Sequence, residues 1–438
     1  MAEKKSGKGK STSKNTRTKA EKQAVEFAKN HKKGVVTAVC VILVIIIAAA
    51  LIIYFCFPNL WKKAADAYGE YTKQYYTDSA DDDPEGTTAK APQEISGADQ
   101  ADILNSEFSI HFLELGNKYA GDCTLIKCGD TEVLIDAGSR TNSASTINAY
   151  LSRYVTDNKI EYVIATHAHQ DHIAGFVGKS AGGSGKDGVL YTYDIGTIIQ
   201  FAGHNTTSGI YNQYVAAVAD AQSRGASVYT ALECWNGENN QSGARRSYDI
   251  SAGGDGSLTL NILYNYYYEH ETADENDYSV CALVTHTSAD GGKQHYLFTG
   301  DLEGKGEEYL VQYNTLPEVE LFKGGHHGSK TSSTDKLLNV IKPQKVAVCC
   351  CAGSTEYTTN HDNTFPTQAF IDRISKWTSW VYVTSLCIDY KSGDFTSMNG
   401  DIVFMYLQGE LQLWCSNNAL PLFKTEWFKN NRKGWGVN

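Results

Sequence analysis

Apolar residues in this chain occur in three arrangements: one long run near the N-terminus, short runs typical of strands, and segments with helical spacing. The long run, residues 34–57, holds 24 consecutive uncharged and mostly apolar residues. That is enough for a helix to cross a bilayer core of about 30 Å at about 1.5 Å per residue. Because aromatic residues and Pro58 follow the run in place of a small-residue cleavage site, the pattern predicts an uncleaved transmembrane anchor, not a signal peptide.

The distribution of charge gives this anchor an orientation. Residues 1–33 contain eleven of the 39 Lys and Arg but three of the 50 Asp and Glu. The positive-inside rule therefore puts this arm in the cytoplasm and everything after about residue 60 outside the cell. A basic arm could instead bind nucleic acid, but its position beside the apolar run makes topology and anionic lipid the simpler explanation. We thus expect the cell membrane as a partner.

The remainder of the chain is acidic, with a formal charge of about −19 after residue 33. Such a surface binds polyanions poorly unless metal ions in a site supply local positive charge. The nine cysteines after residue 57 include no Cys-x-x-Cys pair, which argues against a structural zinc knuckle. Their odd number leaves any disulfide pairing open.

Beyond the anchor, the pattern divides the chain into three parts. Residues 58–105 combine helical spacing at 61–77 with an acidic stretch poor in large apolar residues, and predict a stalk and flexible linker. Residues 106–416 mix strands and helices, which predicts an α/β (α+β) domain of sheets covered by helices. Residues 417–438 are expected to form a C-terminal extension. The predicted strands are 110–113, 124–126, 132–135, 162–165, 257–268, 278–286, 294–299 and 345–350, and the predicted helices are 143–157 and 211–224.

A histidine-rich run, Thr166 to His172, directly follows the predicted strand 162–165 and holds three imidazoles and one carboxylate. Imidazole and carboxylate ligands suit zinc and its first-row neighbours, whereas calcium and magnesium sites are built from oxygens. Residues two apart in an extended segment point the same way, so His167 and His169 can bind one ion. Asp171 and His172, where the chain turns into the Gly175 loop, can then face a second ion. A single histidine is most often a core or surface residue, but four ligand-type residues in six predict a transition-metal site.

Three further segments carry ligand-type residues, two of them at predicted strand ends. Asp136 follows strand 132–135, Asp301 follows strand 294–299, and His326 with His327 stands in a glycine-rich turn. Each of these alone would be weak evidence, because an acid at a strand end is most often a turn residue.

Together with the histidine-rich run, these segments resemble the metallo-β-lactamase superfamily over roughly residues 106–416. Within it the resemblance is greatest to the extracellular hydrolase domain of ComEC-type DNA-uptake proteins and their relatives, which include cell-surface phosphorylcholine esterases. The most specific matches are TGDLE at 299–303 and GHHGSKTSS at 325–333. The opening segment 112–126 also matches, although five residues from Asn117 enlarge a normally tight turn. The resemblance implies an αββα sandwich with the metals at one edge of two facing sheets.

The resemblance also implies roles for individual residues. Two divalent ions are expected, most simply zinc, with manganese or iron as alternatives. Asp136 would orient the histidine loop as a hydrogen-bond partner of a ligand. Asn360-His361 with Phe365-Pro366 resembles the late His-Pro segment of the family. The implied ligands are His167 and His169 for the first ion, Asp171 and His172 for the second, Asp301 between both, and one of His326 and His327 on the second ion, with the other facing substrate.

This sequence departs from the pattern of the superfamily at the ligands of the first ion. Many members of the superfamily have a third histidine ligand between the histidine-rich run and the bridging aspartate. The candidates here are His204, His270 and His286, of which His204, after the apolar residues 198–201, has the most plausible position. A surface-loop histidine explains His204 equally well. The first ion could therefore be weakly held, and a mononuclear enzyme is an alternative.

These features predict a membrane-anchored, extracellular, metal-dependent phosphodiesterase. Two divalent ions would lower the pKa of a water and present hydroxide to an electrophile, so that no protein nucleophile is needed. The substrate would be a phosphodiester of the cell envelope or of nucleic acid. Alternatives are a nuclease associated with DNA uptake and an inactive, metal-bearing binding module, against which the retained ligands argue. The oligomeric state stays open. The expected catalytic side chains are Asp171, His326, His327 and His361, where the histidines hydrogen-bond the phosphoryl group or protonate the leaving alkoxide.

Overall fold

Two mixed β-sheets form the centre of the computed structural model, which describes residues 89, 92–94, 103–179, 186–237, 243–251 and 256–436. These residues belong to one unit that spans 76–438. The predicted anchor at 34–57 and the predicted helix at 61–77 lie outside the described residues. Within the described ranges, no helix has both the length and the apolar character that a membrane crossing requires.

The first sheet has nine strands, and its central part carries the histidine-rich run. Strands β4 to β7 run parallel to one another, and the antiparallel strands β16, β2 and β3 continue the sheet on the β4 side. In spatial order the strands are β1 (Gln93–Glu94), β17 (Glu410–Cys415), β16 (Ile402–Leu407), β2 (Phe108–Phe112), β3 (Thr124–Cys128), β4 (Thr131–Ile135), β5 (Lys159–Ala165), β6 (Asp194–Gln200) and β7 (Ser227–Thr230).

The second sheet has eight strands, with a parallel centre from β11 to β14 and antiparallel strands at both sides. Strands β11 and β12 lead into the segments that contain Asp301 and the His326-His327 pair. In spatial order the strands are β15 (Asp394–Ser397), β14 (Val381–Asp389), β13 (Lys345–Ala352), β12 (Leu321–Lys323), β11 (Lys293–Phe298), β10 (Ala282–Thr287), β9 (Ser257–Ile262) and β8 (Ser247–Asp249).

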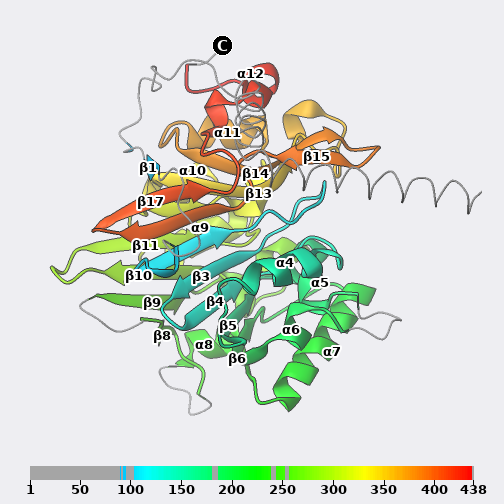
Figure 1. Cartoon of the computed structure of the whole chain (residues 1–438), viewed down its shortest axis with the longest axis vertical. Helices are drawn as coiled ribbons and strands as arrows, with labels where there is room; N and C mark the ends of the chain where they lie inside the picture. The colour runs from blue at the N-terminus through cyan, green and yellow to red at the C-terminus, as the bar shows by residue number, and fades with distance from the viewer. Residues whose placement is uncertain are drawn as a thin grey trace, which may run out of the picture. The chain divides into compact units, whose positions relative to one another are not determined.

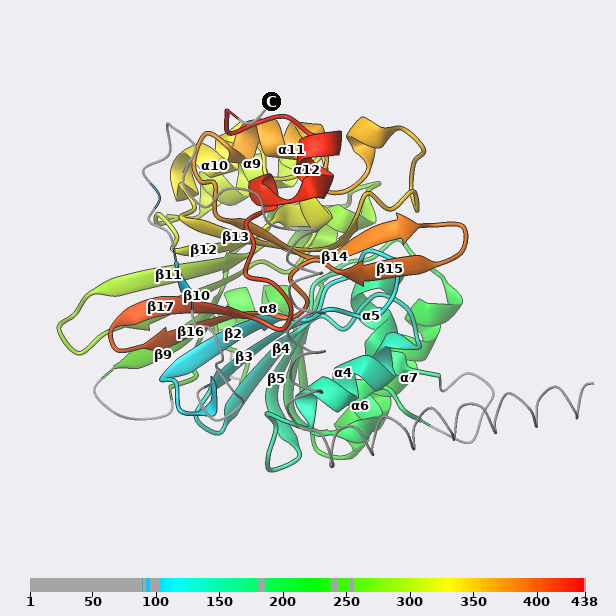
Figure 2. The ribbon, with the colours of Figure 1, turned by 45° about the horizontal axis from the view of Figure 1, so that its top comes forward.

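Helices cover the outer faces of the two sheets, so that the layers run helix, sheet, sheet, helix (Figure 1; Figure 2). This confirms the predicted mixed α/β sandwich. The helices outside the first sheet are α4 (Ser143–Leu151), α5 (Gln170–Val177), α6 (Val189–Thr192) and α7 (Gly209–Ser223), and α8 (Ala231–Trp235) follows β7. Those outside the second sheet are α9 (Gly304–Tyr313), α10 (Asp335–Ile341), α11 (Gln368–Ile374) and α12 (Glu426–Asn431).

Aromatic side chains join the inner faces of the two sheets. Phe108 of β2 packs on Tyr296 of β11 with ring centroids 5.5 Å apart, and Phe404 of β16 lies 6.2 Å from Tyr382 of β14. Burying each such ring contributes about 2 to 3 kcal/mol, and each ring pair roughly 1 kcal/mol more. The cysteines among the described residues form no disulfide, so this apolar interface holds the sheets together.

Some predicted boundaries need correction. The predicted strand 257–268 ends at Ile262, because the buried side chain of Asn265 donates to the carbonyls of Asp277 and Ser279 and turns the chain into a 3-10 helix. Strand 278–286 begins only at Ala282, and helix 143–157 ends at Leu151.

The two ends of the described chain also belong to the domain. Strand β1, which falls in the predicted linker, pairs with β17. The region expected to be a C-terminal extension contributes buried apolar residues, among them Leu422, Phe423, Phe428 and Trp435, to the core beneath α10 and α11. The apolar core therefore continues past residue 416.

Candidate metal centre

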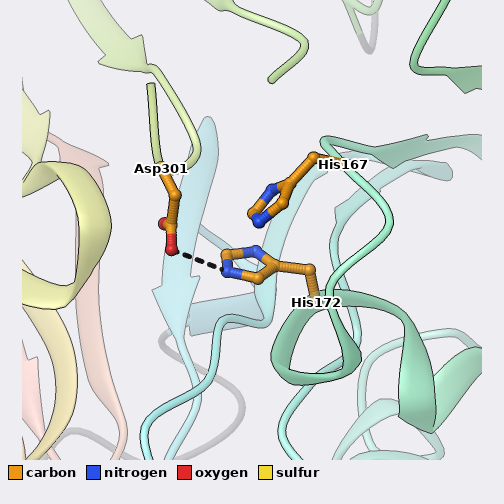
Figure 3. Close-up of side chains that lie close together, drawn as sticks. All are labelled: His167, His172 and Asp301. Carbon is orange, nitrogen blue, oxygen red and sulfur yellow. Dashed lines mark hydrogen bonds and ion pairs between the residues drawn. The ribbon is translucent and has the colours of Figure 1, made fainter. Parts of the chain in front are cut away.

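The carboxyl ends of four strands converge at one edge of the sandwich. Strands β4 and β5 of the first sheet run parallel and end just before Asp136 and His167. Strands β11 and β12 of the second sheet also run parallel, and Asp301 and the His326-His327 turn follow them. Figure 3 shows His167 and His172 on one side and Asp301 on the other, with the side chains pointing toward one another.

The backbone at this edge adopts uncommon conformations. Asp136, His326 and His327 have positive φ angles of 60°, 47° and 54°, which for residues other than glycine concentrate at functional sites. At Gly138, an added Cβ would lie 1.5 Å from the carbonyl oxygen of Asp171. Glycine at this position therefore lets the turn after β4 pack directly against the start of helix α5.

The histidine-rich run does not continue into a loop, as we expected, but into helix α5, which begins at Gln170. Ile173, Phe176 and Val177 are buried at helical spacing. We expected a loop here because of Gly175, although this apolar spacing indicates a helix. Asp171 and His172 thus lie in the first helical turn, where the helix dipole favours a carboxylate.

His172 contacts carboxylates through both ring nitrogens. Its Nδ1 lies 2.8 Å from Asp136 Oδ2, and its Nε2 lies 3.1 Å from Asp301 Oδ2. Asp136 is fixed in turn by the backbone N–H and the hydroxyl of Thr166, which donate to it at 2.8 and 2.7 Å. Asp136 therefore has the geometry of a residue that orients a ligand.

The His326-His327 pair divides into one buried and one partly exposed imidazole. His327 is fully buried, and its Nε2 lies 3.4 Å from Asp171 Oδ2 and 3.3 Å from Asp301 Oδ2 without a hydrogen-bond partner among the described residues. The side chain of His326 is 19% exposed, and its Nε2 lies 3.7 Å from Asp301 Oδ2. His327 thus has the position of a metal ligand, and His326 lies on the more exposed side of the group.

Among the described residues, the part of the site expected to bind the first ion lacks a third histidine. His167 Nε2 lies 3.0 Å from His169 Nδ1, so the two imidazoles share one side of the segment. His204 does not join them. It is exposed, its Nδ1 lies 3.1 Å from the carbonyl of Thr206, and its ring packs on Tyr211. The loop that carries His204 is held instead by the Glu275 carboxylate, which accepts from the N–H groups of Ala168 and Asn205.

The other histidines considered from the sequence have different surroundings. His270 stacks on Tyr266 with ring centroids 3.8 Å apart, and the Nε2 of His286 lies 2.8 Å from Glu107. His361 is exposed in a 3-10 helix, 361–363. None of these belongs to the groups of possible ligands found in the described ranges. Those groups are His167 with His172 and Asp301, Asp171 with His172 and His327, Asp122 with Asp301 and His327, and Asp122 with Asp136 and His172.

Sequence reasoning assigned no role to two buried charges of the site. Asp122 Oδ1 lies 3.1 Å from His327 Nδ1, and its other oxygen forms an ion pair with Lys323. Lys323 Nζ also lies 3.8 Å from Asp301 Oδ1. Both residues stood inside the motifs, Asp122 in the opening segment and Lys323 beside the double histidine. A charged residue between apolar or glycine neighbours was the signal that could have identified them.

The electrostatics of the site favour bound cations. Burial opposes charge on His327, but Asp301 and Asp122 outweigh it and raise the pKa of His327 to about 10. Burial likewise opposes charge on His172, whose pKa Asp301 and Asp136 hold well above its ordinary value. The carboxylates thus favour the protonated, positively charged form of these two imidazoles. A divalent cation bound in place of the protons supplies the same positive charge. The donors, imidazole nitrogens and carboxylate oxygens, fit a first-row transition metal.

Comparisons with known proteins agree with this chemistry. Residues 116–178 match the family model described as the metallo-beta-lactamase superfamily, and this span contains Asp122, Asp136 and the whole histidine-rich run. This segment is therefore similar to the metallo-β-lactamase superfamily. Two curated relatives of this chain are Recombination protein 2 of Haemophilus influenzae, 39% identical over 72 residues, and Competence protein ComA of Neisseria gonorrhoeae, 38% identical over 77 residues. These relatives confirm the resemblance to ComEC-type proteins.

The matched part is short. It covers 16% of this chain and 8% of Recombination protein 2, and 17% of this chain and 10% of ComA. Solved structures similar to this chain include a metallo-β-lactamase with a HARLDQ motif from Cronobacter sakazakii, at 16% identity and a TM-score of 0.26, which covers 48% of this chain and 72% of that one. Another is the metallo-β-lactamase MIM-1 from Novosphingobium pentaromativorans, at 13% identity and a TM-score of 0.24, covering 48% and 74%.

Proposed function

We propose that this chain is a membrane-anchored metallohydrolase that cleaves phosphodiesters outside the cell. The observation that carries the proposal is the position of Asp301. One oxygen of its carboxylate, Oδ2, lies 3.1 Å from His172 Nε2 and 3.3 Å from His327 Nε2, and His167 completes a group with Asp301 and His172. A carboxylate shared by two groups of ligands suits a pair of cations.

The residues that would hold these cations are His167 and His169 on one side and Asp171, His172 and His327 on the other, with Asp301 between. Zinc is the metal we propose, because imidazole and carboxylate ligands suit it. When bound, two divalent cations supply a water that is activated near neutral pH and positive charge for phosphoryl oxygens.

His326 would provide the hydrogen bonding and proton transfer that the reaction also needs. Its Nδ1 lies 3.1 Å from Thr331 Oγ1 and 3.4 Å from Glu303 Oε1, so these groups fix the ring. Its Nε2 turns toward Asp301 at the partly exposed side of the site. In this position His326 would hydrogen-bond a phosphoryl oxygen or give a proton to the leaving alkoxide.

The proposed location rests on residues 34–57, an uncharged and mostly apolar run that follows a basic arm. The acidic charge of the chain after this run favours a cell-envelope phosphodiester as the substrate over a polyanion bound by surface charge. A second candidate, a nuclease associated with DNA uptake, is favoured by the relatives named Recombination protein 2 and Competence protein ComA.

A turnover panel on the full chain, purified in mild detergent and loaded with zinc, tests the proposal. We expect hydrolysis of bis-p-nitrophenyl phosphate, with p-nitrophenyl phosphorylcholine and single-stranded DNA distinguishing the envelope and nucleic-acid candidates. Nitrocefin serves as the β-lactam control. Turnover of nitrocefin alone would contradict a phosphodiesterase, and no turnover of any substrate by fully loaded protein would favour a binding module.

A further inference from the structure

Tyr357 reaches the metal centre from the solvent side. Its hydroxyl donates a hydrogen bond of 2.9 Å to Asp171 Oδ2, while the residue as a whole is 59% exposed. The other groups that hold ligands, such as Asp136 behind His172 and the carbonyl of Cys349 at His327, are buried. Tyr357 therefore differs from these buried supporting groups, because most of its surface is accessible to solvent.

Tyr357 stands in a loop between β13 and the 3-10 helix 361–363, and the neighbouring residue fixes this loop. Glu356 pairs with Arg140 at 2.5 Å and accepts a hydrogen bond of 2.9 Å from the backbone N–H of Ala120. Ser354 also donates to the carbonyl of Lys118 at 3.0 Å. Hydrogen bonds to the enlarged turn that begins at Asn117 thus help to fix the Tyr357 loop.

The ring of Phe365 packs against both Tyr357 and the His326-His327 pair. The ring of Tyr357 lies 5.6 Å from Phe365, and Phe365 lies 5.8 Å from both His326 and His327. His326, which is partly exposed, and Tyr357, which is exposed, therefore both lie near Phe365, and each carries a hydrogen-bonding group.

We propose that Tyr357 is a catalytic residue whose hydroxyl donates a hydrogen bond to a non-bridging phosphoryl oxygen of the substrate. Glu356 and Arg140 are its positioning residues. When a phosphoryl oxygen enters beside Asp171, the hydroxyl can turn from the carboxylate to that oxygen without a change of its backbone. A donor already held in place stabilises the charge that develops there. This inference rests on the proposed phosphodiesterase function.

The test compares Tyr357→Phe, which keeps the ring, with the wild-type full chain after zinc loading. We expect turnover of bis-p-nitrophenyl phosphate to fall about 100-fold, the scale of losing one fixed donor, and inhibition by inorganic phosphate to weaken about tenfold. The zinc content should equal that of the wild type. Tyr390→Phe is the matched control, because Tyr390 packs on Tyr119 and Lys118, and it should behave as the wild type.

Unchanged turnover and phosphate inhibition in Tyr357→Phe would overturn the inference, as would a loss of activity that follows zinc content alone. The inference and the proposed function can fail separately. If the wild type binds zinc but hydrolyses no phosphodiester, the proposed function fails, and weaker phosphate binding by Tyr357→Phe would still identify the hydroxyl as a phosphoryl donor.

The positioning role has its own test. Glu356→Ala should lower kcat in the wild-type background but have no further effect in the Tyr357→Phe background, because both changes remove the same contact. Additive effects of the two substitutions would show that Glu356 does not act through Tyr357.

Discussion

His172 Nε2 and Asp301 Oδ2 lie 3.1 Å apart, although 129 residues separate them in the chain. The contact joins the two sheets at one edge, because His172 follows β5 of the first sheet and Asp301 follows β11 of the second. The sandwich must therefore be assembled before the proposed centre exists. Ligand affinity and folding of the domain are coupled for the same reason.

The first prediction concerns this shared carboxylate. Asp301→Asn keeps the shape of the side chain but removes the negative charge between His172 and His327. We expect the zinc content to fall and turnover to decrease by at least about 1000-fold, equivalent to roughly 4 kcal/mol. Elemental analysis and the bis-p-nitrophenyl phosphate assay measure both effects. Asp290→Asn, in the exposed turn after β10, is the control, and normal activity in Asp301→Asn would contradict the bridging role.

The second prediction separates the two neighbouring histidines. His327→Gln should lose bound zinc together with turnover, because the buried Nε2 of His327 faces Asp171 and Asp301. His326→Gln should retain zinc and lose turnover by about 100-fold or more, as expected for a group that acts on the substrate. Zinc content and kcat, measured on the same preparations, distinguish them. Equal loss of zinc in both variants would mean that His326 is also a ligand.

The third prediction concerns the support behind His172. Asp136→Asn replaces an oxygen that faces His172 Nδ1 and disturbs the hydrogen bonds from Thr166. We expect zinc affinity to fall about 10- to 100-fold, which is typical when the partner of a metal-bound histidine is changed. Competition with a zinc-binding dye measures this affinity. Asp130→Asn, in the exposed turn between β3 and β4, should leave it unchanged, and an unchanged affinity in Asp136→Asn would contradict the supporting role.

The apolar runs predicted sheets covered by helices and placed Asp136, His167 and Asp301 at or near strand ends. The αββα sandwich, with these residues gathered at one edge of two facing sheets, was implied by the family resemblance. The choice between His326 and His327 could not be made, because it depends on two consecutive left-handed residues that point their rings in different directions. Tyr357 was missed because its role arises from a contact across the fold, with Asp171, which no local pattern reports. Lys323 was missed although its position between Phe322 and Gly324 was a local signal.

The last prediction concerns the pH dependence of stability, at a position away from the proposed centre. His111 of β2 is fully buried, with Nδ1 2.7 Å from Tyr150 Oη and Nε2 2.7 Å from Ser109 Oγ. Burial, assisted by the positive charges of Lys127 and Arg153, lowers the pKa of His111 to about 3. The unfolded chain takes up a proton near pH 6.5, whereas the folded protein does not until the pH approaches 3.

The sign follows from this difference in bound protons. The contribution of neutral His111 to stability is complete above pH 6.5 and is lost as the pH falls toward 3, with a slope of at most about 1.4 kcal/mol per pH unit. Urea unfolding of the wild type and of His111→Gln at pH 7.5, 6.0 and 5.0 measures it. The free-energy difference between the two proteins should shrink toward low pH, since other titrating groups are common to both and cancel. A difference that stays constant with pH would show that His111 is protonated in the folded domain.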